Sequence, residues 1–427
     1  MPKINPPNHL NNLDRSNVLV IGLGYVGVPL LEALSGSDKF NLNGYDISEN
    51  VIFKLQNKSG FYKGIDLGKL HDKTINLFSN ASDIKNIDIY IICVPTPLLD
   101  GGPDLRMLRE AGELISGKLK KGDLVILEST SYPGTTEDVL LPILEKSSLK
   151  AGTDFSLAFG SERIDPGNKE YGIKNTPKVI GGIDNLSTVR VKNFYESFVM
   201  EVIEAKGTRE AELSKLLENT YRIVNIALIN ELAMVCHELK IDIWDTIKCA
   251  STKPFGFQAF YPGPGVGGHC IPIDPIYLSR YVFENLNKNF ELINLSQKIN
   301  SNMPSYIVYR IKDLLTNMEK KINGSRVLII GASYKSDVSD TRESPIHDII
   351  EEFISEGVKF TIHDSFVKDL KVNGITHDIL AEIPTNLDVF DLIVILQHHS
   401  DLNMDLLASC KTTIFDTRGK MEFVEKL

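Results

Sequence analysis

The stretch Asn17-Val-Leu-Val-Ile-Gly-Leu-Gly-Tyr-Val-Gly27 decides the fold of the first part of the chain. Its apolar run is typical of a buried strand, and a Gly-x-Gly-x-x-Gly pattern follows it and opens a helical stretch from Val28 to Leu34. In this setting the glycines allow a tight turn, a close approach of backbone to a pyrophosphate, and close packing of the helix. The stretch therefore predicts an α/β domain that binds a dinucleotide through Gly22, Gly24, Tyr25, Val26 and Gly27.

A second strand is expected from Phe40 to Tyr45, and Asp46 ends it about 20 residues after the last glycine. A carboxylate at this point accepts hydrogen bonds from the ribose hydroxyls of the adenosine and repels a 2′-phosphate. Asp46 therefore favours NAD over NADP as the cofactor. The plainer alternative is an aspartate that only forms the turn after the strand.

Further strands are expected from Ile87 to Val94, from Leu124 to Leu127 and from Phe155 to Phe159. Ligands of α/β sheets bind at the carboxyl ends of the strands, so the residues that follow these strands are candidates for a site. The candidates are Pro95 and Thr96 along the cofactor, Thr130, and the pair Glu162 and Arg163. For Thr130 a helix cap remains an equal alternative, and for Glu162 the alternative is a surface salt bridge.

Composition limits the classes of protein that the chain can belong to. With 427 residues, 42% hydrophobic and 24% charged, it is long enough for two or three globular domains. A net charge of −10 argues against a nucleic-acid partner, and no apolar run approaches the roughly 18 residues of a membrane span. The five cysteines are scattered, which is typical of reduced thiols in the cytoplasm, and no ligand spacing predicts a metal site.

A second informative stretch runs from Lys253 to Tyr277 and contains a loop rich in glycine and proline around Cys270. A lone cysteine is usually a small buried side chain, but Cys270 follows two glycines and precedes Asp274-Pro275, a helix start whose dipole would favour the thiolate. Before this loop, Thr208 to Leu239 is free of glycine and proline and predicts one long helix. On it, Lys215 and Asn219 lie one turn apart on the same face.

These segments resemble the UDP-glucose/GDP-mannose dehydrogenase family over about residues 17 to 420. The resemblance rests on Gly-Gly-His-Cys-Ile-Pro-Ile-Asp-Pro275, on the helix motif E-x-x-K-x-x-x-N-x-Y-R-x-x-N that starts at Glu212, and on Tyr334-Lys335 followed by Asp340-Thr-Arg-Glu-Ser-Pro345. Tyr334 stands where the family usually has phenylalanine. Gly160-Ser161 replaces the first two residues of the family's S-P-E-R motif. The amino-acid sequence of the cysteine loop resembles that of the family branch that acts on UDP-N-acetylglucosamine.

The resemblance implies a role for each matched residue. Cys270 would capture an aldehyde, Lys215 and Asn219 would stabilise the oxyanions, and Asp274 would direct the hydrolytic water with Thr130 and Glu162 nearby. Arg342 would reach the cofactor. The substrate would be held by Glu162, Arg163, Lys215, Asn219, Lys253, Phe255, Phe257, Tyr261, Gly267 and Lys335.

The expected fold class is α/β, with two Rossmann-like, doubly wound parallel-sheet domains joined by a helical central domain that carries the long helix. The expected boundaries are an extension at 1–16, the NAD domain at 17–205, the central domain with the catalytic loop at 206–305 and a UDP-sugar domain at 306–427. The last domain repeats the strand–turn pattern at Arg326 to Tyr334 without Gly-x-Gly-x-x-Gly. A homodimer or higher homo-oligomer is expected through the long helix.

The expected activity is the NAD-dependent, four-electron oxidation of a UDP-N-acetylhexosamine at C6 to the uronic acid, in the synthesis of surface polysaccharide sugars. UDP-N-acetyl-D-glucosamine is the first choice of substrate. UDP-N-acetylmannosamine, UDP-N-acetylgalactosamine and UDP-glucose remain alternatives, because separating epimers needs placed hydrogen bonds that a sequence does not show. Two other classes stay open: a two-electron β-hydroxyacid-type dehydrogenase, which needs no cysteine, and a non-catalytic protein that binds nucleotide sugars.

Overall fold

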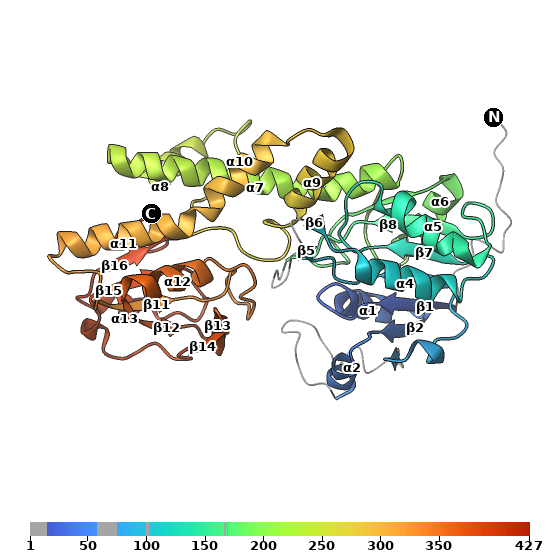
Figure 1. Cartoon of the computed structure of the whole chain (residues 1–427), viewed down its shortest axis with the longest axis horizontal. Helices are drawn as coiled ribbons and strands as arrows, with labels where there is room; N and C mark the ends of the chain where they lie inside the picture. The colour runs from blue at the N-terminus through green and yellow to red at the C-terminus, as the bar shows by residue number, and fades with distance from the viewer. Residues whose placement is uncertain (1–14, 58–74, 100–101, 166–167, 169) are drawn as a thin grey trace. The chain divides into compact units, whose positions relative to one another are not determined.

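The computed structural model describes residues 15–57, 75–99, 102–165, 168 and 170–427 (Figure 1). The chain divides into two compact units, Met1–Glu218 and Asn219–Leu427, here called the N-terminal and the C-terminal unit. Most of the extension expected at 1–16 lies outside the described residues. The α/β class with parallel sheets and a helical central part is confirmed.

The N-terminal unit is built on an eight-stranded sheet in the order β10-β9-β8-β7-β4-β1-β2-β3. Its strands are β1 (Ser16–Ile21), β2 (Phe40–Tyr45), β3 (Ile75–Phe78), β4 (Ile89–Ile92), β7 (Leu124–Leu127), β8 (Ser156–Gly160), β9 (Lys178–Gly182) and β10 (Val202–Glu204). A small hairpin joins β5 (Leu98–Leu99) to β6 (Gly102–Pro103). All neighbours in the large sheet pair in parallel except β8 and β9, which are antiparallel. Parallel pairing needs a crossover, usually a helix, and the described residues between β8 and β9 form none.

Helices cover both faces of this sheet. They are α1 (Gly27–Ser35), α2 (Glu49–Gln56), α4 (Arg106–Ser116), the π-helix η3 (Thr135–Leu140), α5 (Leu141–Leu144), α6 (Asn185–Glu196) and the short 3₁₀ turns η2 (Ala81–Asp83) and η4 (Glu145–Ser147). Alternate residues of β1 serve the two faces, as the strand period of two requires. Val18 and Val20 join the apolar cluster of α1, whereas Leu19 and Ile21 join that of α4.

The strand order reverses at β1, which pairs with β2 on one side and β4 on the other. Here the connections leave in opposite directions and open a crevice at the carboxyl ends of β1 and β4. The loops at this crevice are the glycine loop after β1 and the Pro95-Thr96 loop after β4. The glycine loop and the Pro95-Thr96 loop, both expected along the cofactor, therefore lie at the topological switch point.

Helix α7 (Thr208–Leu239) covers the range predicted from the sequence and begins in the N-terminal unit. It is followed by α8 (Ile243–Ala250), α9 (Asp274–Leu286), α10 (Glu291–Ser301) and α11 (Met303–Asn317) in the C-terminal unit. This long helical run separates the two sheets in the sequence, because no strand is assigned between β10 and β11 among the described residues.

The C-terminal unit contains a five-stranded parallel sheet in the order β12-β11-β15-β16-β17. Its elements are β11 (Arg326–Ile330), α12 (Ile346–Glu356), β12 (Lys359–His363), the hairpin β13 (Asp369–Val372) and β14 (Ile375–Asp378), η5 (Leu387–Val389), β15 (Leu392–Ile395), α13 (Met404–Ser409), β16 (Ile414–Asp416) and β17 (Glu425–Lys426). Helices α11 and α12 pack on one face through a large apolar cluster that includes Ile307 and Phe353.

Candidate functional site

The glycine loop after β1 is shaped by close contacts at two of its three glycines. Gly22 has a φ of +93°, and a Cβ there would lie 2.6 Å from the carbonyl oxygen of Cys93. A Cβ at Gly27 would collide with the carbonyl oxygen of Gly22. No atom lies within 4 Å of a Cβ built at Gly24. The loop is therefore tight where it packs on β4 and α1 and open at the middle glycine, where a pyrophosphate fits at the head of α1.

Asp46 lies at the end of β2 and holds the glycine loop from the side. Its Oδ2 accepts a 2.9 Å hydrogen bond from the backbone N–H of Leu23, and Oδ1 accepts one of 2.9 Å from Ser48. The aspartate is half-buried. A carboxylate has about four acceptor sites, so these two bonds leave capacity for the ribose hydroxyls of a dinucleotide. The turn role and the cofactor role of Asp46 are compatible.

The loops after β4 and β7 are tied together by hydroxyl groups. Thr96 donates a 2.8 Å hydrogen bond to the carbonyl oxygen of Thr130, and Ser129 donates one of 2.7 Å to that of Val94. Thr96 is thereby buried as a structural clasp, while Pro95 and Tyr25 stay exposed. The clasp brings the predicted cofactor residues Thr96 and Thr130 together.

Glu162 and Lys215 form a buried ion pair in the N-terminal unit. Lys215 Nζ lies 3.0 Å from Glu162 Oε2, and the two residues are only 4% and 8% exposed. Glu162 Oε1 also accepts a hydrogen bond from the backbone of Ile164. The surface salt bridge considered for Glu162 is therefore replaced by a buried pair. Buried charges are costly unless paired, so each side chain fixes the other.

Arg163 is turned toward the protein itself. Its Nη2 lies 2.6 Å from Glu218 Oε1, its Nε lies 3.3 Å from Glu218 Oε2, and its Nη1 donates to the carbonyl oxygen of Pro177 at 2.7 Å. This two-pronged pairing holds the loop after β8 to α7. Glu218 is a partner that the sequence pattern did not single out.

Glu212 is a second residue whose role the sequence did not reveal. Its carboxylate accepts hydrogen bonds from the backbone N–H of Gly134 (2.5 Å) and from the N–H and hydroxyl of Thr136 (2.8 and 2.7 Å). Burial raises the pKa of Glu212 to about 7 against the opposing effect of these bonds. The carboxylate meets the amino end of the π-helix η3, where backbone N–H groups lack partners. It thus ties α7, three residues before Lys215, to the segment that follows Thr130.

Cys270 is exposed in the C-terminal unit, just ahead of α9. The backbone N–H of Asp274 donates a 2.9 Å hydrogen bond to the carbonyl oxygen of Cys270. The Asp274 side chain is 1% exposed, and its Oδ2 accepts a 2.6 Å hydrogen bond from Nδ2 of Asn219. Helix α9 begins at Asp274 without any side-chain cap at the preceding Ile273. Asp274 is therefore the first residue of α9, where the sequence suggested the residue before the helix, and its carboxylate accepts from Asn219.

The backbone of the cysteine loop packs directly on the loop that follows β11. A Cβ at Gly267 would lie 2.6 Å from Cβ of Tyr334, and one at Gly268, with a φ of +87°, would lie 2.8 Å from the Tyr334 ring. The N–H of Gly268 donates a 3.0 Å hydrogen bond to the carbonyl oxygen of Arg342. The motif around Tyr334-Lys335 and the motif around Arg342 therefore support the glycines that precede Cys270.

Comparisons with known proteins agree with this arrangement along the chain. Sequence profiles of the UDP-glucose/GDP-mannose dehydrogenase family match its NAD binding domain at residues 16–199, its central domain at 209–302 and its UDP binding domain at 328–422. The chain belongs to the UDP-glucose/GDP-mannose dehydrogenase family. As a member of this family it is an NAD-dependent UDP-sugar dehydrogenase, an oxidoreductase.

Two curated relatives are equally similar in sequence. The UDP-N-acetyl-D-mannosamine dehydrogenase of Methanocaldococcus jannaschii is 36% identical over 390 residues, 90% of this chain and 86% of that protein. The UDP-N-acetyl-D-glucosamine 6-dehydrogenase of Pseudomonas aeruginosa is 36% identical over 358 residues, 82% of this chain and 83% of that protein. Among solved structures, the UDP-D-ManNAc dehydrogenase from Pyrococcus horikoshii superposes with a TM-score of 0.84 at 30% identity, covering 96% of this chain and 97% of that one.

In this family member the aromatic front of the cysteine loop packs mostly on itself and on its neighbours. Lys253 Nζ lies 5.0 Å above the ring of Phe255, which is well exposed, as is Phe257 to a lesser degree. Tyr261 stacks on Trp244 with ring centroids 6.0 Å apart and planes 13° from parallel. Lys253, Phe255 and Tyr261 are all accessible side chains, and Tyr261 also stacks on Trp244.

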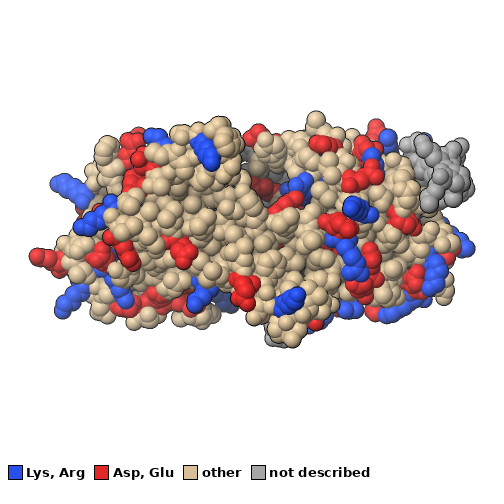
Figure 2. Space-filling model, turned by 90° about the horizontal axis from the view of Figure 1, so that it is seen from above, with Lys and Arg blue, Asp and Glu red and all other residues tan. Residues whose placement is uncertain are grey.

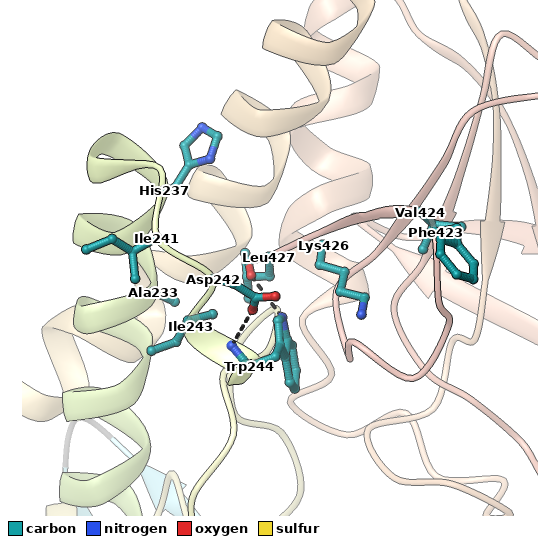
Figure 3. A pocket seen from close by; sticks show the side chains of 10 residues that line it. All are labelled: Ala233, His237, Ile241, Asp242, Ile243, Trp244, Phe423, Val424, Lys426 and Leu427. Atoms are coloured by element: carbon teal, nitrogen blue, oxygen red, sulfur yellow. Dashed lines mark hydrogen bonds between the residues drawn. The ribbon is translucent and has the colours of Figure 1, made fainter. Parts of the chain in front are cut away.

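A hollow of about 250 Å³ lies beside Trp244, between the end of α7, the start of α8 and the last residues of the chain (Figure 3). The Trp244 indole N–H donates a 3.1 Å hydrogen bond to the carbonyl oxygen of Leu427, and Asp242 accepts from the backbone N–H of Trp244 at 2.8 Å. The residues that line this hollow come from α7, α8, the turn between them and the segment 423–427, and Trp244 also stacks on Tyr261 of the segment before Cys270.

The remaining basic candidates of the C-terminal unit follow β11. Arg342 makes a two-pronged pair with Asp340, with Nη2 at 2.7 Å from Oδ2 and Nε at 3.0 Å from Oδ1. Lys335 is half-buried, and its carbonyl oxygen accepts a 2.7 Å hydrogen bond from Ser333. Acidic and basic side chains are interspersed on the face shown in Figure 2. An anionic UDP-sugar must therefore be met by individual cations such as these.

The C-terminal sheet has a glycine turn after its strand β11 that resembles the turn after β1. The carboxylate that would correspond to Asp46 is Asp364, and it is already hydrogen-bonded within the protein. Gly331 follows β11 with a φ of +90°, and Asp364 follows β12 as Asp46 follows β2. Asp364 Oδ2 accepts from the N–H groups of Ala332 (2.7 Å) and Ser333 (3.1 Å) and pairs with His399 Nε2 at 2.9 Å. A fully buried, saturated carboxylate has no capacity for a ribose.

Among the residues that the structure describes, no group of three or more His, Cys, Asp or Glu side chains is placed to hold a metal ion. Within the same residues, no helix combines the length and apolar character that crossing a membrane requires.

Proposed function

We propose that this chain oxidises the C6 hydroxymethyl group of a UDP-N-acetylhexosamine to the carboxylate in two successive two-electron steps. The observation that carries the proposal is the group formed by Cys270, Asp274 and Asn219: an accessible thiol four residues ahead of a buried carboxylate that an amide holds in place. A dehydrogenase that stops at two electrons needs neither the thiol nor the carboxylate. A four-electron oxidation needs both, one for capture and one for hydrolysis.

The N-terminal unit supplies the residues for hydride removal. The open Gly24 and the spare acceptor capacity of Asp46 suit a dinucleotide, and NAD, when bound, accepts the hydride in each oxidation step. Lys215 and Glu162, already paired at 3.0 Å, are the groups that take up and stabilise charge at the alcohol oxygen as it becomes a carbonyl. Thr130, held by Thr96, faces the same crevice at the carboxyl end of β7.

Cys270 acts in the second half of the reaction. The first oxidation gives an aldehyde, and the thiolate sulfur adds to its carbon to form a thiohemiacetal, so that the reactive aldehyde remains bound. Loss of a second hydride converts the thiohemiacetal to a thioester. Asp274 then directs water onto the thioester carbon, the C–S bond breaks and the thiolate is restored. In total one alcohol, two NAD and one water give one carboxylate, two NADH and three protons.

The identity of the sugar is proposed at the level of the UDP-N-acetylhexosamine class. The resemblance of the cysteine loop favours UDP-N-acetyl-D-glucosamine, while a relative of equal identity is named for UDP-N-acetyl-D-mannosamine. The two sugars differ only at C2, and a site distinguishes them by hydrogen bonds to the N-acetyl group. Lys253, Phe255, Phe257 and Tyr261 are exposed and Lys335 is half-buried, so these predicted substrate residues keep accessible surface for such contacts.

The test is the purified chain with NAD and a panel of UDP-N-acetylglucosamine, its manno and galacto epimers, and UDP-glucose. We expect two NADH per sugar consumed, and a product whose mass is that of the uronic acid. One N-acetylated sugar should give a kcat/KM at least about tenfold above UDP-glucose, as expected when a buried polar group is left without its partner. One NADH per sugar would support the two-electron alternative, and binding without any NADH would support the non-catalytic one.

We also propose that the protein forms a homodimer through α7, in the cytoplasm. Several large apolar side chains of this helix are exposed in the single chain, namely Leu213, Leu217, Leu228, Val235 and Leu239. Contiguous exposed apolar surface commonly marks a protein interface. Light scattering should give twice the mass of the chain, and Leu228→Asp should shift the population toward monomer.

A further inference from the structure

A second buried ion pair lies in the N-terminal unit and has no place in the reaction as described so far. Lys178, at the start of β9, lies with Nζ 2.9 Å from Oε1 of Glu128, the residue after β7. The two residues are 8% and 2% exposed. The hydroxyl of Tyr195, from α6, donates to the same Oε1, and Lys178 Nζ lies 4.6 Å from the centre of the Tyr195 ring. Buried ion pairs seldom add net stability, so such a group points to another use.

This second pair is close to the Glu162–Lys215 pair. Glu128, Lys178 and Glu162 line one small hollow of about 20 Å³, about the space of a single water molecule. The buried thiol of Cys93 is affected by all four charges: burial and the two glutamates raise its pKa, and the two lysines lower it. Two positive and two negative groups therefore form one electrostatic cluster below the crevice.

The departure of Gly160 from the family's S-P-E-R motif has a physical reason in this cluster. A Cβ at Gly160 would lie 2.7 Å from the hydroxyl oxygen of Tyr195 and 3.1 Å from its ring carbons. The glycine at the end of β8 leaves the room that the tyrosine hydroxyl needs to reach Glu128. Gly160 stands two residues before Glu162, so this fit is made at the base of the loop that presents Glu162.

We propose that Glu128, Lys178 and Tyr195 are positioning residues that set the charge around the Glu162–Lys215 pair and fix the base of the loop that presents Glu162. The inference rests on the proposed function for the role of Glu162. Tyr195 acts as a fixed donor and not as a proton relay, because burial raises its pKa well above the ordinary value. The charged and titratable groups around Glu162 are Lys215 from α7, Glu128 just after β7, Lys178 from β9 and Cys93 from the loop after β4, with Arg163 and its partner Glu218 beside it.

The decisive measurement is the acid limb of the pH profile of kcat/KM, followed by NADH release. Glu128→Gln removes a negative charge near the Glu162–Lys215 pair and should move the limb to lower pH. Lys178→Met removes a positive charge and moves the limb to higher pH, by about half a pH unit or more in each case. Damage to packing alone would not shift the limb in opposite directions. Shifts of the same sign, or none, would overturn the proposal.

Lys192→Met is the matched control. Lys192 lies on α6, the helix that carries Tyr195. Like Lys178 it pairs with a glutamate, Glu204, at 2.5 Å, but this pair is on the surface. Its removal should leave the pH profile unchanged within error. A shift as large as that of Lys178→Met would show that long-range charge, and not the buried cluster, sets the limb.

Gly160 and Tyr195 give a second, independent test. Gly160→Ala pushes the tyrosine hydroxyl away, and Tyr195→Phe removes it, so each should lower kcat by about three- to tenfold through the same lost hydrogen bond. The double variant should be no worse than either single one. If the losses in kcat multiply in the double variant, the two residues act separately, and the proposed link between Gly160 and Tyr195 is contradicted.

Failure of the inference can be told apart from failure of the proposed function. If the wild-type chain releases no NADH with any sugar of the panel, the proposed function fails. The coupling between Glu128 and Glu162 is then tested by the thermal unfolding temperatures of their variants. Glu128→Gln, Glu162→Gln and the double variant should show losses in Tm that differ from additivity by several degrees, since the two carboxylates share one hollow. Additive losses would overturn the inference whatever the activity.

Discussion

Asn219 and Asp274, far apart in the sequence, are joined by a hydrogen bond of 2.6 Å between amide Nδ2 and carboxylate Oδ2. The bond fixes the first residue of α9 to the middle of α7, and it leaves the amide as the donor to a carboxylate that is almost fully buried. Because the backbone N–H of Asp274 also donates to the carbonyl oxygen of Cys270, the first residue of α9 is linked both to Asn219 and to the backbone that carries the thiol.

Asp274→Asn should stop the reaction after the second hydride has left. The proposed thioester then has no base to direct water, so steady-state NADH release should fall by about 100-fold or more. A burst of two NADH per chain should precede this slow phase, and intact-mass spectrometry should find the protein carrying the acyl sugar nucleotide. A variant that is slow but shows no added mass would contradict the assignment of Asp274 to hydrolysis.

Cys270→Ser should abolish the second oxidation while the fold remains intact. A hydroxyl is a far weaker nucleophile than a thiolate at neutral pH, so the release of two NADH per sugar should be lost. Cys249→Ser is the matched control, because Cys249 is another exposed cysteine of the same unit. Full four-electron activity in Cys270→Ser would remove the basis of the proposed function.

Gly268→Ala should misplace the cysteine loop. The added Cβ meets the Tyr334 ring at 2.8 Å in a backbone conformation, φ +87°, that alanine rarely adopts. Activity should fall at least about tenfold, since a small displacement of a reacting group is costly. Gly324→Ala has a similar φ of +83° and no neighbour within 4 Å. It should lose about 1 kcal/mol of stability and keep its activity. Equal activity in both alanine variants would show that the Tyr334 contact does not position Cys270.

Glu212 should make stability depend on pH between pH 4.5 and about 7, the ordinary and the folded pKa of this carboxyl. Burial raises the pKa in the folded chain, so between these values the folded state holds a proton that the unfolded state has lost, and stability falls as the pH rises. The total is about 3 kcal/mol at 1.36 kcal/mol per pKa unit. Chemical unfolding across this range should show a flatter slope in Glu212→Gln. The exposed Glu113→Gln should keep the wild-type slope, and an unchanged slope in Glu212→Gln would refute the prediction.

Asp46 and Asp364 occupy matching places in the two sheets and should respond in opposite ways to removal. Asp46→Ala should weaken NAD binding by about tenfold, because the ribose loses a charged acceptor, with little change in Tm. Asp364→Ala leaves four backbone N–H groups and His399 without their fully buried acceptor, so it should lower Tm by several degrees and leave the Kd for NAD unchanged. Titration calorimetry measures the Kd for NAD and thermal melts measure Tm. An Asp46→Ala variant that keeps its affinity for NAD, or an Asp364→Ala variant that keeps its Tm, would contradict the prediction.

Regular elements with continuous patterns could be predicted from the sequence to the residue. The strands at 40–45 and 124–127 and the helix at 208–239 coincide with β2, β7 and α7. Each is either an apolar run between clear stop signals or a long helical pattern without glycine or proline. The dinucleotide loop could also be predicted from the sequence, since its three glycines and Asp46 lie close together in the chain.

Contacts between distant residues could not be predicted in the same way. Nothing in the sequence around Asp274 separates a helix cap from a carboxylate held by Asn219, because the partner lies on another helix. The Glu128, Lys178 and Tyr195 cluster joins three elements, and its one local sign was the unusual Gly160. Likewise, Glu212 looked like part of a family motif, while its three hydrogen bonds go to a segment more than seventy residues earlier in the chain.

Trp244 is the single tryptophan of the chain, and it stacks on Tyr261, binds the carbonyl oxygen of Leu427 and touches the backbone at Gly419. Any rearrangement of the segment before Cys270 or of the last strand must change the surroundings of this one indole. Its fluorescence therefore has one source and needs no added label. Stopped-flow emission can time when the aromatic segment shifts on addition of a nucleotide sugar, against the separate absorbance of NADH.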